Sequence, residues 1–180
     1  MVEYITGEVV MFFRNFSYIH QADLICKDEE YYSLVSDILE HKEVLKMKDF
    51  IQHGQTNCYE HCLNVSYYSY LICKKLGLDA KSAARGGMLH DLFLYDWHLQ
   101  DSSNVPLFKK HAFSHPYIAL KNAKKYFNLN RKEKDIIVKH MWPVTIILPK
   151  YKESYIITLV DKICCVAETV YTAIPQKIYI

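Results

Sequence analysis

Apolar residues recur at every third or fourth position along most of this 180-residue chain, the spacing that places them on one face of an α-helix. No stretch alternates convincingly between apolar and polar positions, as a half-buried strand would, although "VTIILP" (144–149) could form a short extended piece. We therefore predict an all-α fold, a bundle of roughly seven helices. The predicted helices cover 29–47, 58–76, a segment that starts after Asp79 and contains Gly86-Gly87, Ser114 to Phe127, Asn130 to just before Pro143, and 153–171.

Polar residues at the predicted helix starts support these boundaries. Thr56 or Asn57 can cap the helix that begins at residue 58, and Asp79 can cap the next one, because short oxygen-bearing side chains accept from the free N–H groups of a first turn. Asn130 is followed three residues later by Glu133, the spacing of a capping box.

Length and composition favour one compact domain. Half of the residues are apolar (51%), and the chain has only 5 Gly and 5 Pro. The formal charge of +2 is too small to predict a nucleic-acid polymer as partner. The first residues carry no basic signal region, no apolar run is long enough for a membrane span, and the six cysteines form no CxxC pair. We expect a cytoplasmic protein with no membrane partner.

The stretch "GGMLHDLFLYDWH" (86–98) places His90 and Asp91 side by side among apolar residues. Burying such groups without partners costs several kcal/mol, so something must compensate for it. A hydrogen-bonded pair, a proton-transfer pair and a metal ion would each do so.

Four more ionisable residues fall on inward helix faces or at helix ends: His61, His115, His140 and Asp161. A single inward histidine is more often a hydrogen-bonded core residue than a ligand. Six such groups on five helices are better explained by convergence on a cation. Imidazole and carboxylate suit Fe, Mn, Zn, Co or Ni, and six ligands are too many for a structural zinc but suit two ions bridged by a carboxylate.

The ordered set His61, His90-Asp91, His115, His140 and Asp161 resembles the HD-domain superfamily of metal-dependent phosphohydrolases, in the form with two extra histidines. The resemblance covers roughly 50–170. It implies a single HD domain over 1–180, with 1–49 as a helical extension packed on the core. It also implies that the first metal is held by His61, His90, Asp91 and Asp161, and that Asp91 bridges to a second metal held by His115 and His140.

The resemblance further implies two divalent transition-metal ions that activate water against a small phosphate ester or nucleotide. The chain lacks the "HDIGK" and "GYP" motifs of cyclic-di-GMP phosphodiesterases. Two alternatives stay open. Inositol-oxygenase-like proteins resemble this chain with the same ligand set around a di-iron pair, and a non-catalytic domain could sense a nucleotide or serve as an interaction module.

Neighbouring residues supply candidates for the remaining roles. Asp91 is expected to be catalytic as the metal bridge, and His111 and His53 are candidates for protonating the leaving group. Asp96 and Glu168 could orient a ligand histidine. A substrate phosphate could meet the basic side chains of Arg85, Lys109, Lys110, Lys139 and Lys162.

Overall fold

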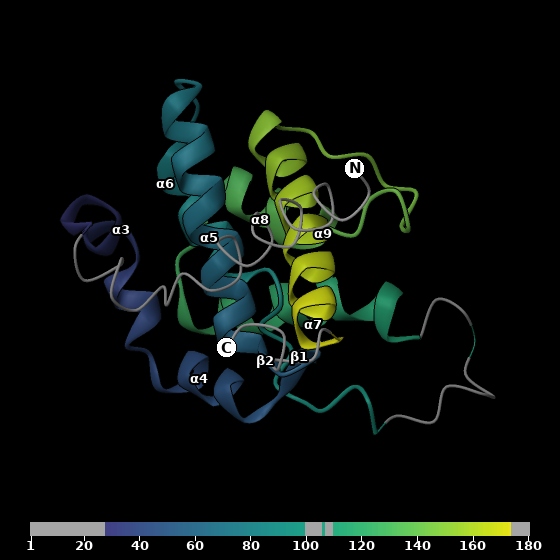
Figure 1. Ribbon diagram of the computed structural model, residues 1–180. Helices are drawn as coiled ribbons and strands as arrows, with labels where there is room; N and C mark the ends of the chain where they lie inside the picture. Colours follow the sequence, from purple (N-terminus) through teal and green to yellow (C-terminus); the bar gives the residue numbers. More distant parts are fainter. Residues whose placement is uncertain (1–27, 100–105, 107–109, 174–180) are drawn as a thin grey trace, which may run out of the picture.

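The computed structural model describes residues 28–99, 106 and 110–173. Within these residues the fold consists of seven α-helices, one 3-10 helix and one two-stranded hairpin, which confirms the all-α prediction. Figure 1 shows α5 and α9 near the middle of the molecule, with α8 visible between them. The elements are α3 (Glu29–Leu39), α4 (Lys42–Leu45), η1 (Lys46–Asp49), β1 (Ile51–His53), β2 (Thr56–Asn57), α5 (Cys58–Lys75), α6 (Ala80–Leu89), α7 (His111–Tyr126), α8 (Arg131–Lys139) and α9 (Lys152–Ala173).

The predicted caps lie at the helix starts and make the expected hydrogen bonds. Asn57, rather than Thr56, caps α5, and its side chain accepts from the backbone N–H of Glu60. Asp79 caps α6 in the same way. Asn130 and Glu133 form the capping box of α8, with reciprocal bonds of 2.9 and 2.8 Å. These bonds are local in the sequence, which is why the sequence alone could predict them.

The N-terminal half differs from the prediction at two places. The helix expected over 29–47 breaks after Leu39, and α4 begins at Lys42 with His41 as its cap. The hairpin β1–β2 was not predicted, because strands of three and two residues are too short to show a period. Gly54 allows its turn with a φ of +59°.

Helix ends differ in the second half. Helix α6 ends at Leu89, so His90 is its last half-helical residue and Asp91 lies beyond it, rather than both lying inside a helix. Helix α7 begins at His111, one turn earlier than expected, and α8 ends at Lys139. The segment 144–149 contains turns and bends rather than a strand.

A single close contact at the centre of the molecule sets the position of the His90-Asp91 pair. A Cβ atom added to Gly87 on α6 would lie 2.7 Å from the Cα of Ser66 on α5, so the two backbones nearly touch. A Cβ added to Gly86 would instead lie 2.8 Å from side-chain atoms of Ile136 on α8. The adjacent glycines therefore bring three helices together directly before the pair.

Gly87→Ala is expected to lower the free energy of unfolding by about 1–3 kcal/mol, the usual cost of overpacking a core. Gly86→Ala should cost less, because the side chain of Ile136 can shift where a backbone cannot. Urea denaturation of the two variants measures the difference. Equal stability of Gly87→Ala and the unchanged protein would contradict the close helix contact.

The described part of the N-terminal region packs into the same core as the remaining helices. Tyr31, Val35 and Ile38 of α3 are fully buried, and the Tyr31 hydroxyl lies 2.7 Å from Ser66 Oγ of α5. Residues 1–27 of the predicted extension lie outside the described residues. No helix in 28–99 or 110–173 combines the length and apolarity that a membrane span needs.

Candidate metal centre

Six buried ionisable residues meet where the ends of several helices converge. They are His61 of α5, His90 and Asp91 at the end of α6, His115 of α7, His140 at the end of α8 and Asp161 of α9, each less than a tenth exposed. These are the six ligands predicted from the sequence. The structure therefore brings together residues that span a hundred positions of the chain.

One half of the cluster is centred on Asp161. Its Oδ1 lies 3.1 Å from His61 Nε2 and 3.7 Å from His90 Nε2. These three residues each offer a ligand atom, and the three atoms lie within 4.8 Å of one another. They form one potential metal site.

The other half is centred on Asp91. Its Oδ1 lies 3.2 Å from His115 Nε2 and 3.4 Å from His140 Nε2, and these two nitrogens are 2.8 Å apart. His90 connects the halves, because its Nε2 lies 3.6 Å from Asp91 Oδ2 and it groups with Asp91 and His140 as well as with Asp161.

The four histidines all use Nδ1 for a supporting bond and point Nε2 into the cluster. Backbone carbonyls and a carboxylate only accept, so Nδ1 carries a proton in each ring and Nε2 is the nitrogen left to bind a metal. The Nδ1 bonds are His90 to Gly87 O (2.7 Å), His115 to His111 O (2.7 Å), His140 to Ile137 O (2.9 Å) and His61 to Glu168 Oε2 (2.9 Å).

The cluster contains acceptors that lack donors. The Nε2 atoms of His115 and His140 face each other and Asp91 Oδ1, and all three are acceptors in this arrangement. Among the described residues, His90 Nε2 and Asp91 Oδ1 are buried without a hydrogen-bond partner. A cation would satisfy these lone pairs, and the mixture of imidazole and carboxylate fits a divalent transition metal.

Electrostatics keep the central groups of the cluster in the ligand form. Burial alone would raise the pKa of Asp91 and of Asp161, but neighbouring histidines hold both pKa values well below their usual range. Burial lowers the pKa of His140 to about 3. At neutral pH, two carboxylates are therefore ionised and His140 is neutral.

Two other histidines attract protons. Burial opposes a charge on His61, but Glu168 raises its pKa well above the usual value. The pKa of His90 is also raised well above its usual value, because Cys62 and Asp91 outweigh the effect of burial. Binding of a divalent cation at these nitrogens would therefore displace protons.

A family model described as "HD domain" matches residues 58–167, more than half of the chain and a range that contains all six cluster residues. The chain belongs to the HD domain family. Most members of that family are metal-dependent phosphohydrolases. No curated protein and no solved structure matched the chain.

Of the two carboxylates that the sequence offered for orienting a ligand histidine, Glu168 contacts a histidine of the cluster, whereas Asp96 contacts a different residue. The buried Glu168 accepts from Asn64 Nδ2 through Oε1 while Oε2 holds His61, so it fixes the ring of that histidine. Asp96 Oδ1 instead accepts from the backbone N–H of the exposed His98 and lies 3.3 Å from Nδ1 of the His98 ring. Asn64 was missed, although it lies one helical turn after His61 on the same helix.

The two candidate proton donors lie next to ligand histidines of the HD domain. The ring centroid of His53 is 5.0 Å from that of His61, and burial lowers the pKa of His53. His111 stacks on His115 at 4.5 Å, and burial lowers its pKa to about 4. Both are neutral at pH 7, so each is suited to accepting a proton or a hydrogen bond.

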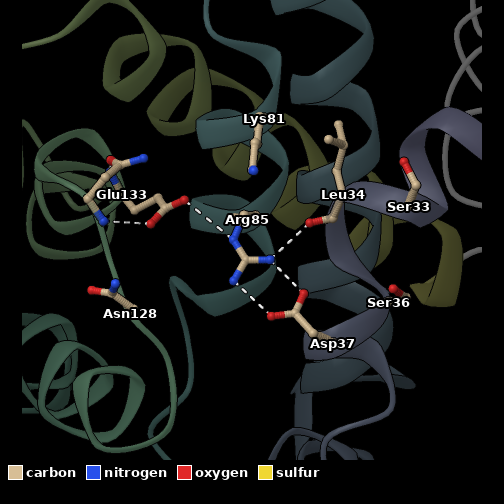
Figure 2. Close-up of a pocket in the computed structure, with 9 residues that line it drawn as sticks. Ser33, Leu34, Ser36, Asp37, Lys81, Arg85, Asn128 and Glu133 are labelled. Atoms are coloured by element: carbon tan, nitrogen blue, oxygen red, sulfur yellow. Dashed lines mark hydrogen bonds and ion pairs between the residues drawn. The ribbon is translucent and has the colours of Figure 1, made fainter.

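Arg85 was predicted to bind substrate, but the structure places it in a different part of the HD domain. Figure 2 shows its guanidinium between Asp37 and Glu133, at a cavity of about 520 Å³ formed with α3 and α8. The Arg85 guanidinium donates two hydrogen bonds of 2.6 and 2.9 Å to Asp37 and a third to the backbone carbonyl of Leu34. Its Nε lies 3.5 Å from the carboxylate of Glu133. The donors of Arg85 therefore connect α6 to α3 and α8.

One of the lysines predicted to bind a phosphate pairs with a carboxylate outside the cluster. Lys139 pairs with Asp135 at 2.5 Å, one turn earlier on α8. Lys110 precedes α7, and its backbone carbonyl accepts from the N–H groups of Phe113 and Ser114 in the first turn of that helix. Lys109 lies outside the described residues. Lys162, another of the candidate lysines, lies next to the cluster: its Nζ is 3.7 Å from Asp161 Oδ2.

Asp37→Asn is expected to lower the melting temperature slightly and to leave metal binding intact. The guanidinium of Arg85 holds the pKa of Asp37 below its usual value, so this stabilisation is present above the ordinary pKa of the carboxyl and is lost as the pH falls through the lowered one. Because Asp37 is more than half exposed, the loss should stay within about 1 kcal/mol. Thermal melts and metal analysis check both points, with Asp161→Asn as the variant that should lose metal. Loss of metal from Asp37→Asn at unchanged stability would contradict this placement of Arg85 and support a role for it at the cluster.

Proposed function

We propose that this HD domain hydrolyses a small phosphate ester or nucleotide with the help of two divalent transition-metal ions, of Fe, Mn, Ni, Co or Zn type. The observation that carries the proposal is the inward convergence of four Nε2 atoms on two ionised carboxylates, one of which, Asp91, faces histidines with both oxygens.

The residues divide into two ligand groups in this proposal. His61, His90 and Asp161 would hold one ion, His115 and His140 the other, and Asp91 would contribute to both. Bound ions of this kind lower the pKa of a coordinated water and neutralise phosphoryl oxygens during displacement. Burial of all six residues excludes bulk water from the ligands and strengthens their electrostatic interactions.

Other residues would position the substrate and handle protons. Lys162 donates from Nζ to the carbonyl of His140 at 3.1 Å and is partly exposed, so its ammonium could meet a phosphate that approaches the cluster. The neutral ring of His111 lies 3.0 Å from the Tyr95 hydroxyl through Nδ1. Because His111 and His53 are neutral, either ring would first accept a proton released at the cluster and then pass it to the leaving group.

We further propose a small phosphorylated metabolite or nucleotide as partner, rather than a membrane or a nucleic-acid polymer, and the cytoplasm as the location. The location is supported by the cysteines, because Cys58, Cys62, Cys73, Cys164 and Cys165 are all free thiols.

A panel of phosphorylated metabolites tests the proposal. Protein loaded with Mn²⁺ should release phosphate or a nucleotide product under anaerobic conditions, and Asp91→Asn prepared in the same way should not. The matched variant controls for a contaminating phosphatase. Turnover only with Fe²⁺ and O₂, accompanied by oxygen consumption, would contradict hydrolysis and favour oxygenase chemistry. Metal binding without turnover of any compound under either condition would favour a sensing or interaction module.

A further inference from the structure

A glutamine in the short hairpin contacts the carboxylate at the centre of the cluster. Gln52 lies in the middle of β1 and is only 5% exposed. Its side-chain amide donates from Nε2 to Asp91 Oδ2 at 2.6 Å, across 39 positions of sequence. No feature of the sequence pattern singled out Gln52.

A tryptophan fixes which end of this amide faces the carboxylate. Trp97 donates from Nε1 to Gln52 Oε1 at 3.2 Å. An indole N–H can only donate, so the carbonyl end of the amide must face Trp97 and the NH₂ end must face Asp91. The reversed amide would oppose oxygen to carboxylate and NH₂ to N–H, with two repulsive contacts in place of two hydrogen bonds. The direction of the chain Trp97–Gln52–Asp91 is therefore set by chemistry.

The indole itself is held in place by stacking. Trp97 stacks with His98, at 3.8 Å between centroids, and with His111, at 5.0 Å with a 10° angle between planes. His111 in turn stacks on the ligand His115. The segment that carries Trp97 turns sharply after the ligand pair, where Leu94 has a φ of +59°. The indole therefore has little freedom to leave the amide.

The two carboxylate oxygens of Asp91 have different neighbours. Oδ2 accepts from Gln52 and lies 3.6 Å from His90 Nε2, while Oδ1 faces His115 and His140. The terminal torsion of an aspartate is broad, so nothing within the side chain itself would hold its carboxylate plane. A partner on one oxygen fixes the plane and with it the aim of the other oxygen.

We infer that Gln52 is a positioning residue that holds the Asp91 carboxylate in its bridging orientation, and that Trp97 orients Gln52 for this role. The inference rests on the proposed two-metal function. Supporting residues of this kind typically change metal affinity 10- to 100-fold when they are replaced. The ion at His115 and His140 depends most on the aim of Asp91 Oδ1, because the other ion also has Asp161.

Calorimetric titration of chelator-treated protein with Mn²⁺ tests the inference. Gln52→Leu removes the amide at similar volume and should weaken the weaker of two binding steps by roughly 10- to 100-fold, with the tighter step changed much less. Trp97→Phe should act in the same direction by a smaller factor. The double variant should bind no more weakly than Gln52→Leu, because both residues act through one chain.

Gln55→Leu is the matched control, since Gln55 lies in the same hairpin but is exposed. It should bind Mn²⁺ as the unchanged protein does. Circular dichroism verifies that each variant folds, and Trp97→Phe tests the chain even if Gln52→Leu does not fold, because it leaves Gln52 in place.

The outcomes separate this inference from the proposed function. Two Mn²⁺ equivalents in the unchanged protein with equal affinities in Gln52→Leu, or in Trp97→Phe where only that variant folds, would overturn the positioning role and leave the function standing. Additive losses in the double variant would overturn the role of Trp97 as the residue that orients Gln52. Absence of Mn²⁺ binding from the unchanged protein would overturn both proposals.

Discussion

Asp91→Asn is expected to abolish turnover and to weaken both metal-binding steps, with a larger loss than any other single substitution in the cluster. Both oxygens of Asp91 face histidines of the cluster, and the introduced amide has one acceptor in place of two and no charge. The affinity loss should exceed the roughly 10- to 100-fold that follows replacement of a residue that only supports a ligand.

The same substitution should also lower the free energy of unfolding of the metal-free protein at neutral pH. Neighbouring histidines hold the pKa of Asp91 well below its usual range, so the ionised carboxylate stabilises the folded state above its ordinary pKa. Asparagine carries no charge and loses this stabilisation. Urea denaturation in the presence of chelator and calorimetric metal titration measure the two effects. Retention of both metals by Asp91→Asn would contradict the bridging role.

His140→Ala is expected to remove one of two metal equivalents and to abolish hydrolysis, while the other equivalent remains. His140 Nε2 lies 3.4 Å from Asp91 Oδ1 and 2.8 Å from His115 Nε2, whereas Asp161 faces His61 and His90, so the first group of ligands keeps its composition. Two ions are needed in the proposed mechanism because one supplies the nucleophile and both stabilise the charge on the phosphoryl group.

Elemental analysis of protein purified without chelator measures this loss. His41→Ala is a suitable control, because His41 caps α4 and packs on Tyr126 and Phe127 rather than on the cluster. That variant should keep both equivalents. Full metal content and full activity in His140→Ala would show that the second group of ligands does not form a metal site.

The six cluster residues could be singled out from the sequence as candidate ligands, because helical periodicity places some of them on inward faces and the others at helix ends. His61 and Asp161 lie on long helices whose apolar residues mark the buried side. The caps at Asn57, Asp79 and Asn130 were equally predictable, since each bonds to a backbone group three residues away.

Contacts between distant segments were beyond the sequence. Gln52 and Asp91 are brought together only when the hairpin packs against the end of α6, and a three-residue strand carries no period that would mark Gln52 as inward. The end of α6 was not marked in the sequence either, because the apolar run continues through Leu92-Phe93-Leu94 while the helix stops at Leu89. The bond from His90 to the carbonyl of Gly87 is made at that end.

Arg85 shows why proximity in sequence is a weak guide to a site. It precedes His90 by five residues, which on an α-helix corresponds to a rotation of about 140° around the axis. The two side chains therefore leave α6 in different directions, and Arg85 reaches Asp37 on α3 and Glu133 on α8. A prediction based on helix faces rather than on distance along the chain would have separated the two.

Metal-edge anomalous scattering from crystals of the native protein tests the central claim most directly. The account predicts two anomalous peaks within the cluster, one among His61, His90 and Asp161 and one beside Asp91, His115 and His140, for Mn, Fe, Co, Ni or Zn either carried from expression or soaked. A cluster without an anomalous peak after soaking with each of these metals would contradict it.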